Sequence, residues 1–492
     1  MNKELNNTII NDDILKISNA FKTNDNNFEI YLVGGCVRDY VLGNKPHDFD
    51  MTTNATPSEI KEILRINNID FHNLGEKFGT IVARLNGEEY EITTYRTELS
   101  YSDGRHPDEV QFSKSLEEDL SRRDFTINAM AMDPFTGEII DPFSGLDDIE
   151  NRTIRAVGDP GDRFKEDGLR ILRALRFAIR YEFAVDRDTK IAMLSHKNML
   201  NNVSRERCTD ELRKIFEYNK PIKDLFNEFK EIIFKILPDL KPLDGCEQNN
   251  KYHHESVWLH TLSVVDNIHE PNFILKLAGL LHDIGKPATK TTDENGQNHF
   301  IGHPVFSEKI VEKMLSTSLP MEDKKLILSK KEYEHLSKLV SIHDNNLSIS
   351  KKHLRKALVK YGPDFIKDWR ILSNADFSAH VVPKDITEEK MAEWHTDNDT
   401  FNQMLNEILE EEQAFSLKDL KINGNDLREL GIAPGPTIGF ILKNLFDDVI
   451  NERILNDKEI LLSKSQEMIN SYNNIDEDIQ KSEDKIKEQI NL

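Results

Sequence analysis

A β-rich, alternating segment at residues 28–33 runs directly into two glycines, Gly34 and Gly35, after which a short helix can begin. The glycines permit a tight turn and leave backbone N–H groups uncovered. A junction of strand, glycine turn and helix can hold a phosphate group, because the first N–H groups of a helix have no partner within it. The segment therefore predicts a phosphate-binding turn.

Asp48 and Asp50 follow this turn and are separated only by Phe49. On an extended chain the two carboxylates emerge on one face and Phe49 points into the core. Carboxylates this close repel each other unless a divalent cation lies between them, and Mg²⁺ suits the arrangement. An isolated Asp-x-Asp is usually a solvated turn. Beside the glycine turn, the pair instead predicts the metal centre of a nucleotide-transfer site.

Residues 78–85 and 88–95 flank Asn86-Gly87, which predicts a β-hairpin. In the second strand Tyr90 and Ile92 share one face. If that face packs on the core, Glu91 lies on the other and can be a third acid beside the aspartate pair. The alternative is a solvated strand glutamate.

Residues 121–130 are expected to begin a helix that faces the site. Arg122 and Arg123 can hold triphosphate oxygens with their forked donors. Asp124 and Asn128, one turn apart, can grip a ribose hydroxyl or a base. An exposed, capped helix is the alternative interpretation.

The periodicity of residues 164–180 predicts one amphipathic helix with arginines along one face. Asp167 and Arg170 stand at i, i+3, where side chains are neighbours. Together they can match the Watson–Crick edge of cytosine or adenine, whose amino group the carboxylate accepts, whereas uracil has none. A helical salt bridge and a solvated arginine face remain open as alternatives. Glu206, Arg207 and Glu211 are interpreted as supports for this helix.

With 492 residues the chain is long enough for about three domains. Its net charge of −23 (64 basic minus 87 acidic residues) disfavours indiscriminate binding to nucleic acid, so an RNA partner requires a local basic surface.

Three widely spaced cysteines form no C-x-x-C, which disfavours a disulfide partner and a thiolate zinc site. No apolar run approaches the ~18 residues that span a bilayer, and the N-terminus lacks an apolar signal core. We therefore expect a cytoplasmic protein without a membrane partner.

The runs at residues 34–39, 48–50, 122–130, 166–170 and 206–207 resemble, in this order, the class II nucleotidyltransferase family, which contains bacterial tRNA CCA-adding enzymes and poly(A) polymerases. The resemblance implies that the aspartate pair binds the catalytic metals, that Arg-Arg-Asp contacts sugar and phosphates, and that Glu-Asp-x-x-Arg selects CTP or ATP. Residues 103–107 resemble the loop with which full CCA-adding enzymes switch from C to A. The expected nucleotide-binding residues are Gly34, Gly35, Arg38, Arg122, Arg123, Asp124, Asn128, Asp167, Arg170, Arg173 and Arg176.

From Lys251 the chain is rich in histidine. His282-Asp283 ends an apolar stretch, and an imidazole beside a carboxylate suits a divalent metal of unknown identity. The pattern His260, His282-Asp283 and Asp376 resembles the HD phosphohydrolase superfamily, in which a metal-activated water attacks a phosphate. His303 and His343 can add ligands for a second metal.

The expected fold is α+β: a polymerase-beta-like head with a small mixed sheet, then an all-α neck, an HD domain and a helical tail. The expected bounds are 1–140 for the head, 141–250 for the neck, 251–385 for the HD domain and 386–492 for the body and tail, whose charged C-terminus we expect to be frayed or disordered. The expected function is addition of C, C and A to the 3′ end of tRNA from CTP and ATP. A poly(A) polymerase, a partial CC- or A-adding enzyme, and an HD hydrolase with an inactive head are the alternatives.

Overall fold

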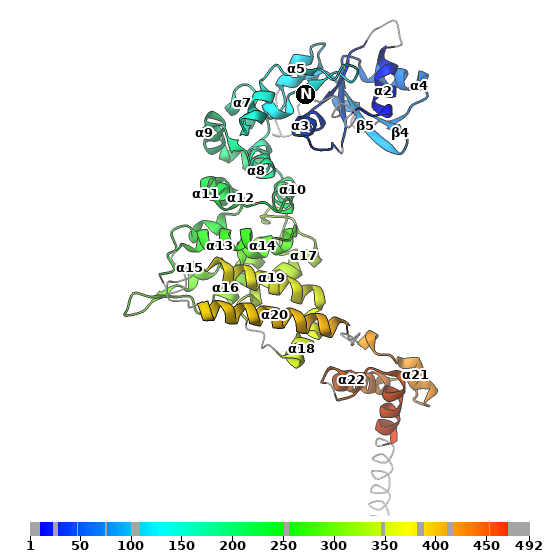
Figure 1. The fold of residues 1–492 in the computed structure, drawn as a ribbon, viewed down its shortest axis with the longest axis vertical. Coiled ribbons are helices and arrows are strands. Elements are labelled where there is room, and N and C mark those ends of the chain that lie inside the picture. The colour runs from blue at the N-terminus through cyan, green and yellow to red at the C-terminus, as the bar shows by residue number, and fades with distance from the viewer. Residues whose placement is uncertain are drawn as a thin grey trace, which may run out of the picture. The chain divides into compact units, whose positions relative to one another are not determined.

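The computed structural model describes residues 10–22, 28–46, 48–73, 76–99, 109–249, 255–345, 350–380, 388–410, 417–451 and 453–470. The chain forms two compact units (Figure 1). Unit 1 comprises Met1–Gln248 and Glu255–Ser337, and unit 2 comprises Asn249–His254 and Lys338–Leu492. The loop predicted at 103–107 and the charged segment beyond Asn473 lie outside the described residues.

Unit 1 begins with a seven-stranded sheet of order β3-β4-β5-β2-β1-β8-β9. The β2–β5 pair is parallel and the other pairs are antiparallel, which confirms the predicted small mixed sheet. Its strands are β1 (Ile30–Val33), β2 (Asp50–Thr53), β3 (Asp70–His72), β4 (Thr80–Leu85), β5 (Glu88–Thr94), β8 (Ala131–Met132) and β9 (Ile139–Ile140).

The hairpin of β4 and β5 turns at Asn86-Gly87, where both residues have positive φ, as predicted. Tyr90 and Ile92 are buried in the core. This core is covered by α2 (Asp12–Lys22) and α4 (Pro57–Ile66), which lie beside the sheet in Figure 1, and by α3 (Gly35–Val41). Because Tyr90 and Ile92 face inward, Glu91 lies on the opposite face of β5.

The prediction that a helix begins at Ser121 is wrong. Helix α5 (Leu116–Ser121) ends there, and only a 3-10 turn, η2 (Thr126–Asn128), follows. Phe125 is extended and pairs with Ala156 in a β-bridge, and its backbone N–H donates to the carboxylate of Asp124. These partners compete with helical hydrogen bonds, so the Arg-Arg-Asp run crosses the site as a bend.

The prediction of a single helix over residues 164–180 is also wrong, because this segment contains two helices, α7 (Pro160–Glu166) and α8 (Leu169–Tyr181). Asp167 is extended between them, with φ −142° and ψ 107°. At Gly168 a Cβ would lie 2.6 Å from the carbonyl oxygen of Met199, so only glycine lets the chain pass there. The predicted apolar face of α8, including Leu172, is buried.

The remaining elements of the chain are mainly helical. Unit 1 also contains η1 (Glu76–Phe78), β6 (Arg96–Leu99), β7 (Glu109–Phe112), α6 (Gly145–Glu150), β10 (Thr153–Ile154), β11 (Ala184–Val185), α9 (Arg187–Ser195), η3 (Lys197–Asn202), α10 (Arg205–Glu217), α11 (Lys223–Glu228), α12 (Lys230–Ile236), η4 (Pro238–Leu243), α13 (Val257–Asn267), α14 (Phe273–Leu281), α15 (Lys286–Thr289), β12 (Thr291–Thr292), β13 (Asn298–His299) and α16 (His303–Leu315). Helix α17 (Lys330–Ile342) runs from unit 1 into unit 2. Unit 2 contains α18 (Lys351–Tyr361), α19 (Pro363–Ala379), α20 (Glu388–Glu410), η5 (Leu417–Asp419), α21 (Gly424–Glu429) and α22 (Pro436–Ile450).

In the part of the chain that the structure describes, no helix is both long and apolar enough to cross a bilayer.

Candidate functional site

The glycine turn lies at the end of β1. Gly34 has φ 73°, which favours glycine, and a Cβ at this position would lie 2.8 Å from Nη1 of Arg123. The N–H of Gly34 donates to the carbonyl of Met130, and α3 starts at the next residue. The turn therefore brings the Arg123 guanidinium directly against the backbone that we expect to bind phosphate.

The predicted acids meet at the neighbouring strands β2 and β5. Asp50 begins β2 and is directly paired in register with Glu91 on β5. Asp48 is exposed just before the strand, and Phe49 stacks on Tyr90 with ring centroids 6.2 Å apart, as its predicted inward orientation requires.

The electrostatics of these acids reflect crowding of like charge. Burial raises the pKa of Asp50, the Arg123 guanidinium lowers it, and Asp48 raises it again. Burial also raises the pKa of Glu91, and the charges of Asp50 and Asp48 raise it further. A divalent cation would relieve this repulsion, and three carboxylates offer the oxygen ligands that Mg²⁺ prefers.

A cleft of about 420 Å³ opens beside the glycine turn. Its lining contains six arginines and three aspartates, so the cleft carries an excess of positive charge that suits a polyanion such as a triphosphate. The lining residues are Gly34, Gly35, Arg38, Asp50, Arg122, Arg123, Asp124, Asn128, Asp167, Leu169, Arg170, Arg173, Phe177 and Arg207. Ten of the eleven expected nucleotide-binding residues are among them.

Asp124 is the centre of a buried network in this cleft. Its carboxylate accepts from Arg173 Nε at 2.7 Å and from Asn128 Nδ2 at 3.0 Å, and Asn128 in turn accepts from Arg38. Burial opposes ionisation of Asp124, but Arg173, Asn128 and Arg170 outweigh it and lower the pKa to about 2. The carboxylate is therefore charged at neutral pH and fixes both a cleft arginine and Asn128.

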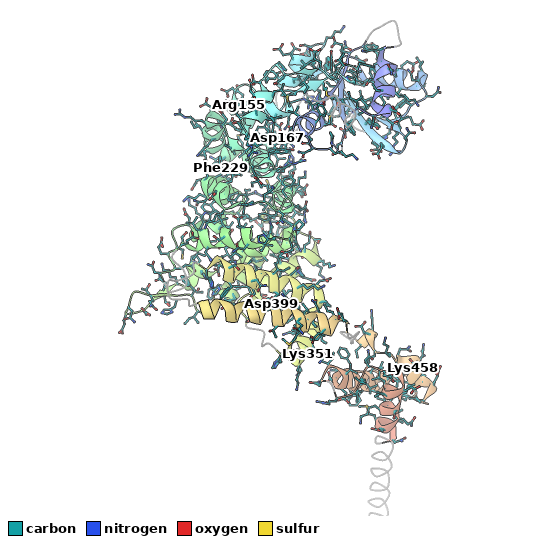
Figure 2. The ribbon with its side chains drawn as sticks, in the orientation of Figure 1. Arg155, Asp167, Phe229, Lys351, Asp399 and Lys458 are labelled. Carbon is teal, nitrogen blue, oxygen red and sulfur yellow. The ribbon has the colours of Figure 1, made fainter. Side chains whose placement is uncertain are left out.

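Asp167, labelled in Figure 2, and Arg170 line the cleft but do not form the helical salt bridge considered above. Asp167 accepts from Arg207 Nη2 at 2.7 Å, and Arg170 pairs with Glu166 and donates to the Arg122 carbonyl at 3.0 Å. The break between α7 and α8 gives each side chain its own partner. Arg207 thus supports the segment as predicted.

Arg176 is not among the described residues that line the cleft. It is buried, and its Nε donates to Glu211 at 2.6 Å while the guanidinium covers the ring of Phe177. These contacts tie α8 to α10, which fits the supporting role predicted for Glu211.

Two residues of the site were missed. Phe177 lines the cleft and lies under the guanidinium groups of Arg38, Arg173 and Arg176, with distances of 5.3, 5.4 and 4.3 Å to the ring centroid. Asp119 pairs with Arg122 and Arg123 from one turn earlier. An acid at i−3 and i−4 of an arginine pair was a signal that could have found it.

A second group of site residues surrounds Asp283 in unit 1. His260, His282 and Asp283 are buried, and one ligand atom of each lies within 4.8 Å of the others. Nε2 of His303 lies 3.1 Å from the Asp283 carboxylate, and Nζ of Lys286 lies 2.6 Å from it. The sequence predicted these three histidines and Asp283 as ligands, and the structure brings them together.

The orientation of the imidazoles suits metal binding. Nδ1 of His282 lies 2.8 Å from the Gly279 carbonyl, and Nδ1 of His303 lies 2.9 Å from that of Phe300. Because a carbonyl only accepts, each Nδ1 donates to it, and Nε2 of each ring faces the Asp283 carboxylate. Burial raises the pKa of Asp283, but His282 and Lys286 outweigh this and hold the pKa well below its usual range. Once a metal displaces any proton on Nε2, these imidazoles and the ionised carboxylate fit a divalent ion.

The other two predicted HD residues belong to unit 2. Nδ1 of His343 lies 2.8 Å from the Val340 carbonyl, the same arrangement as in the other histidines. Asp376 lies 3.8 Å from His380 on the same segment.

Comparison with known proteins gives four family matches along the chain: the poly(A) polymerase head domain at residues 30–155, the RNA- and SrmB-binding site of polymerase A at 182–240, the HD domain at 251–376, and domain 2 of tRNA nucleotidyltransferase at 379–464. Together with the acid-bearing sheet and the arginine-lined cleft, they define a tRNA nucleotidyltransferase with a poly(A)-polymerase-type head and an HD domain.

Individual relatives are more specific. The chain is 30% identical over 472 residues to the CCA-adding enzyme of Ligilactobacillus salivarius, which covers 91% of this chain and 95% of the relative. It is 48% identical over 192 residues to that of Enterococcus faecalis, covering 39% and 46%. The crystal structure of the Bacillus stearothermophilus CCA-adding enzyme in complex with CTP matches with a TM-score of 0.59 at 25% identity, covering 94% and 98%. The chain belongs to the CCA-adding enzyme family.

The Asp124 network predicts a pH-dependent stability. The folded-state pKa of about 2 lies below the ordinary value of 3.8, so the ionised carboxylate stabilises the fold fully above about pH 4 and loses this effect as the pH falls towards about 2. Asp124→Asn should therefore lower the free energy of unfolding by roughly 2 kcal/mol at neutral pH, and by about half as much near pH 3. Urea unfolding of both proteins at the two pH values measures this difference, and a difference independent of pH would contradict the assignment.

Proposed function

We propose that this chain adds C, C and A in turn to the 3′ end of tRNA, using CTP and ATP and releasing pyrophosphate. The family supports this function, and the observation that carries it is the pairing of Asp50 with Glu91 beside an arginine-lined cleft. The matched Bacillus stearothermophilus enzyme is in complex with CTP, which supports the same substrate for this cleft.

The reaction needs the acids and the arginines in different roles. Asp48, Asp50 and Glu91 would hold divalent cations, which we propose to be Mg²⁺ because all the donors are oxygens. Bound there, the metal would lower the pKa of the tRNA 3′-hydroxyl and neutralise charge that develops on the α-phosphate. Arg123, beside the Gly34 turn, and Arg122, in the lining of the same cleft, would hold the triphosphate in line with the acids.

Asp167 and Arg170 are proposed to select the base. The Asp167 carboxylate can accept the amino group of cytosine or adenine, and Arg170 can donate to the ring nitrogen or carbonyl. Each is held in place by a separate partner, Arg207 for Asp167 and Glu166 for Arg170. Because their positions do not depend on each other, the two side chains present a fixed acceptor and a fixed donor.

We further propose that residues 1–140, 141–250, 251–385 and 386–492 act as head, neck, HD domain and body with tail, and that the enzyme works in the cytoplasm. The three cysteines are buried and unpaired, which fits a reducing compartment.

The HD residues support a second activity, hydrolysis of a phosphate ester. The supporting observation is that three imidazoles converge on the buried, ionised Asp283. A divalent metal held there would activate water for attack on phosphorus. His343 and Asp376 are proposed to complete the ligand set.

The decisive experiment offers tRNA lacking its 3′ end together with CTP, ATP or both. Addition of three nucleotides, with the A only after two C, supports the proposal. A long ladder of A would identify a poly(A) polymerase, and one or two nucleotides a partial enzyme.

Asp50→Ala should abolish incorporation, with a loss of at least about a thousandfold in kcat, because the reaction loses a carboxylate ligand of the proposed metal centre. Asp70→Ala, an exposed aspartate on β3, is the matched control and should retain the wild-type rate. Primer extension measures both, and an active Asp50→Ala enzyme would refute the assigned metal site.

Asp167→Ala should reduce discrimination against UTP by about ten- to a hundredfold, because the acceptor for the exocyclic amino group is lost. The control is Asp162→Ala, an exposed residue of α7 whose pairing with Lys165 leaves the cleft untouched. The ratio of kcat/KM for CTP and UTP is the measurement. Undiminished discrimination would exclude the selecting role.

His282→Ala should spare nucleotide incorporation but remove metal-dependent hydrolysis of a phosphomonoester or a 2′,3′-cyclic phosphate, because one imidazole ligand is lost. Metal content by atomic absorption should fall in parallel. Loss of incorporation together with hydrolysis would show that the two activities are not independent.

A further inference from the structure

Asp119 is the most completely hidden charged residue near the cleft. It lies near the end of α5 and its side chain is 0% exposed, yet the two arginine side chains that it contacts are 17% and 18% exposed. A buried carboxylate is costly unless it is paired. The partners of Asp119 therefore indicate its role in the site.

Each oxygen of this carboxylate has its own partners. Oδ1 accepts from Arg122 Nη2 at 2.8 Å and Nε at 3.0 Å, and from the Arg96 backbone N–H at 3.4 Å. Oδ2 accepts from the Thr52 hydroxyl at 3.3 Å and lies 3.5 Å from Arg123 Nη2. Burial opposes ionisation of Asp119, but Arg122 and Arg123 outweigh it and hold its pKa below the ordinary value.

The contact to Thr52 ties this group to the acids. Thr52 lies on β2, two residues after Asp50, and its hydroxyl also contacts the carbonyl of Thr93 on β5 at 3.1 Å. The strand pair that aligns Asp50 with Glu91 thus also holds the carboxylate that orients the arginines.

The group of Asp119, Arg122 and Arg123 carries a net positive charge, because one carboxylate faces two guanidinium groups. Part of this charge lies beside Asp50, whose pKa Arg123 lowers. Nε of Arg123 is buried and has no hydrogen-bond partner among the described residues, and Nη1 of the same side chain faces the Gly34 turn.

We propose that Asp119 is a positioning residue for nucleotide binding: it fixes Arg122 and Arg123 at a set distance from the catalytic acids, so that they receive the triphosphate of any incoming nucleotide. The inference rests on the proposed nucleotidyl transfer. It assigns Asp119 to the triphosphate and not to the base or the tRNA, and this distinction can be tested.

Asp119→Asn keeps the size of the side chain and removes its charge. The KM for CTP and for ATP should rise by about tenfold and by similar factors, because both nucleotides share the triphosphate. The KM for tRNA and the ratio of kcat/KM for CTP and UTP should stay at wild-type values. If Asp119 only stabilised the fold, its substitution would not raise the KM for nucleotides while leaving the KM for tRNA and the CTP/UTP ratio unchanged.

Asp148→Asn is the matched control. Asp148 is also a buried carboxylate, and it accepts from a threonine hydroxyl, Thr126 at 2.7 Å, and from an arginine, Arg155, labelled in Figure 2. Its partner Arg155 does not line the cleft, whereas Arg122 and Arg123, the partners of Asp119, do. Its substitution should cost comparable stability and leave the KM for CTP unchanged.

Thr52→Val serves as the second variant, since it removes one hydroxyl that holds Asp119 and should raise the KM for CTP by about two- to threefold. The proposal is overturned by a folded Asp119→Asn enzyme with an unchanged KM for nucleotides, or by an equal rise in Asp148→Asn. If Asp119→Asn does not fold, Thr52→Val decides: a raised KM supports the positioning role, and an unchanged one refutes it.

Measuring CTP binding to the same proteins by calorimetry tests the positioning role of Asp119 separately from the proposed nucleotidyl transfer. A wild-type chain that binds CTP but extends no tRNA would contradict the proposed function, while the comparison of the variants would still test Asp119.

Discussion

Repulsion between carboxylates on two neighbouring strands is the constraint around which the catalytic half of this enzyme is built. The parallel register of β2 and β5 places Asp50 opposite Glu91. Burial raises the pKa of both, Asp48 raises that of Asp50 further, and Asp50 and Asp48 raise that of Glu91. A fold keeps such an arrangement only if the hydrophobic side of the same strands stabilises it more than the repulsion costs. Phe49, Tyr90 and Ile92 provide that side.

Around the cleft, other carboxylates are instead neutralised by arginines. Asp119, Asp124 and Glu211 are buried carboxylates, and each is paired with arginines that come from the cleft or the helix behind it. Such pairs add little stability when they replace apolar packing, but they fix orientation. The site therefore combines crowded acids, whose repulsion a cation would relieve, with guanidinium groups held in place for an anion.

The sequence predicted those parts of the structure that depend on neighbouring residues. The hairpin at Asn86-Gly87, the inward Phe49 and the face occupied by Glu91 follow from strand alternation and turn chemistry, and all were confirmed. The order of the motifs gave the family and most of the residues that line the cleft. The roles of those residues, and the four domain bounds, stay predictions.

The errors came from contacts between distant parts of the chain. The helix expected from Ser121 is interrupted because Phe125 pairs with Ala156, and the helix over 164–180 breaks where Gly168 packs on Met199. Local periodicity contains no information about either contact. Arg176 stays a predicted nucleotide-binding residue, and its contact with Glu211 on another helix fits the supporting role predicted for Glu211.

The pairing of Asp167 with Arg207 has a consequence for anyone who redesigns this enzyme. Exchanging the acid at 167 alone to favour another base would leave a half-buried guanidinium at 207 without its counter-ion, 40 positions further along the chain. If Asp167 selects the base as proposed, a substitution at this position is best combined with a compensating one at Arg207.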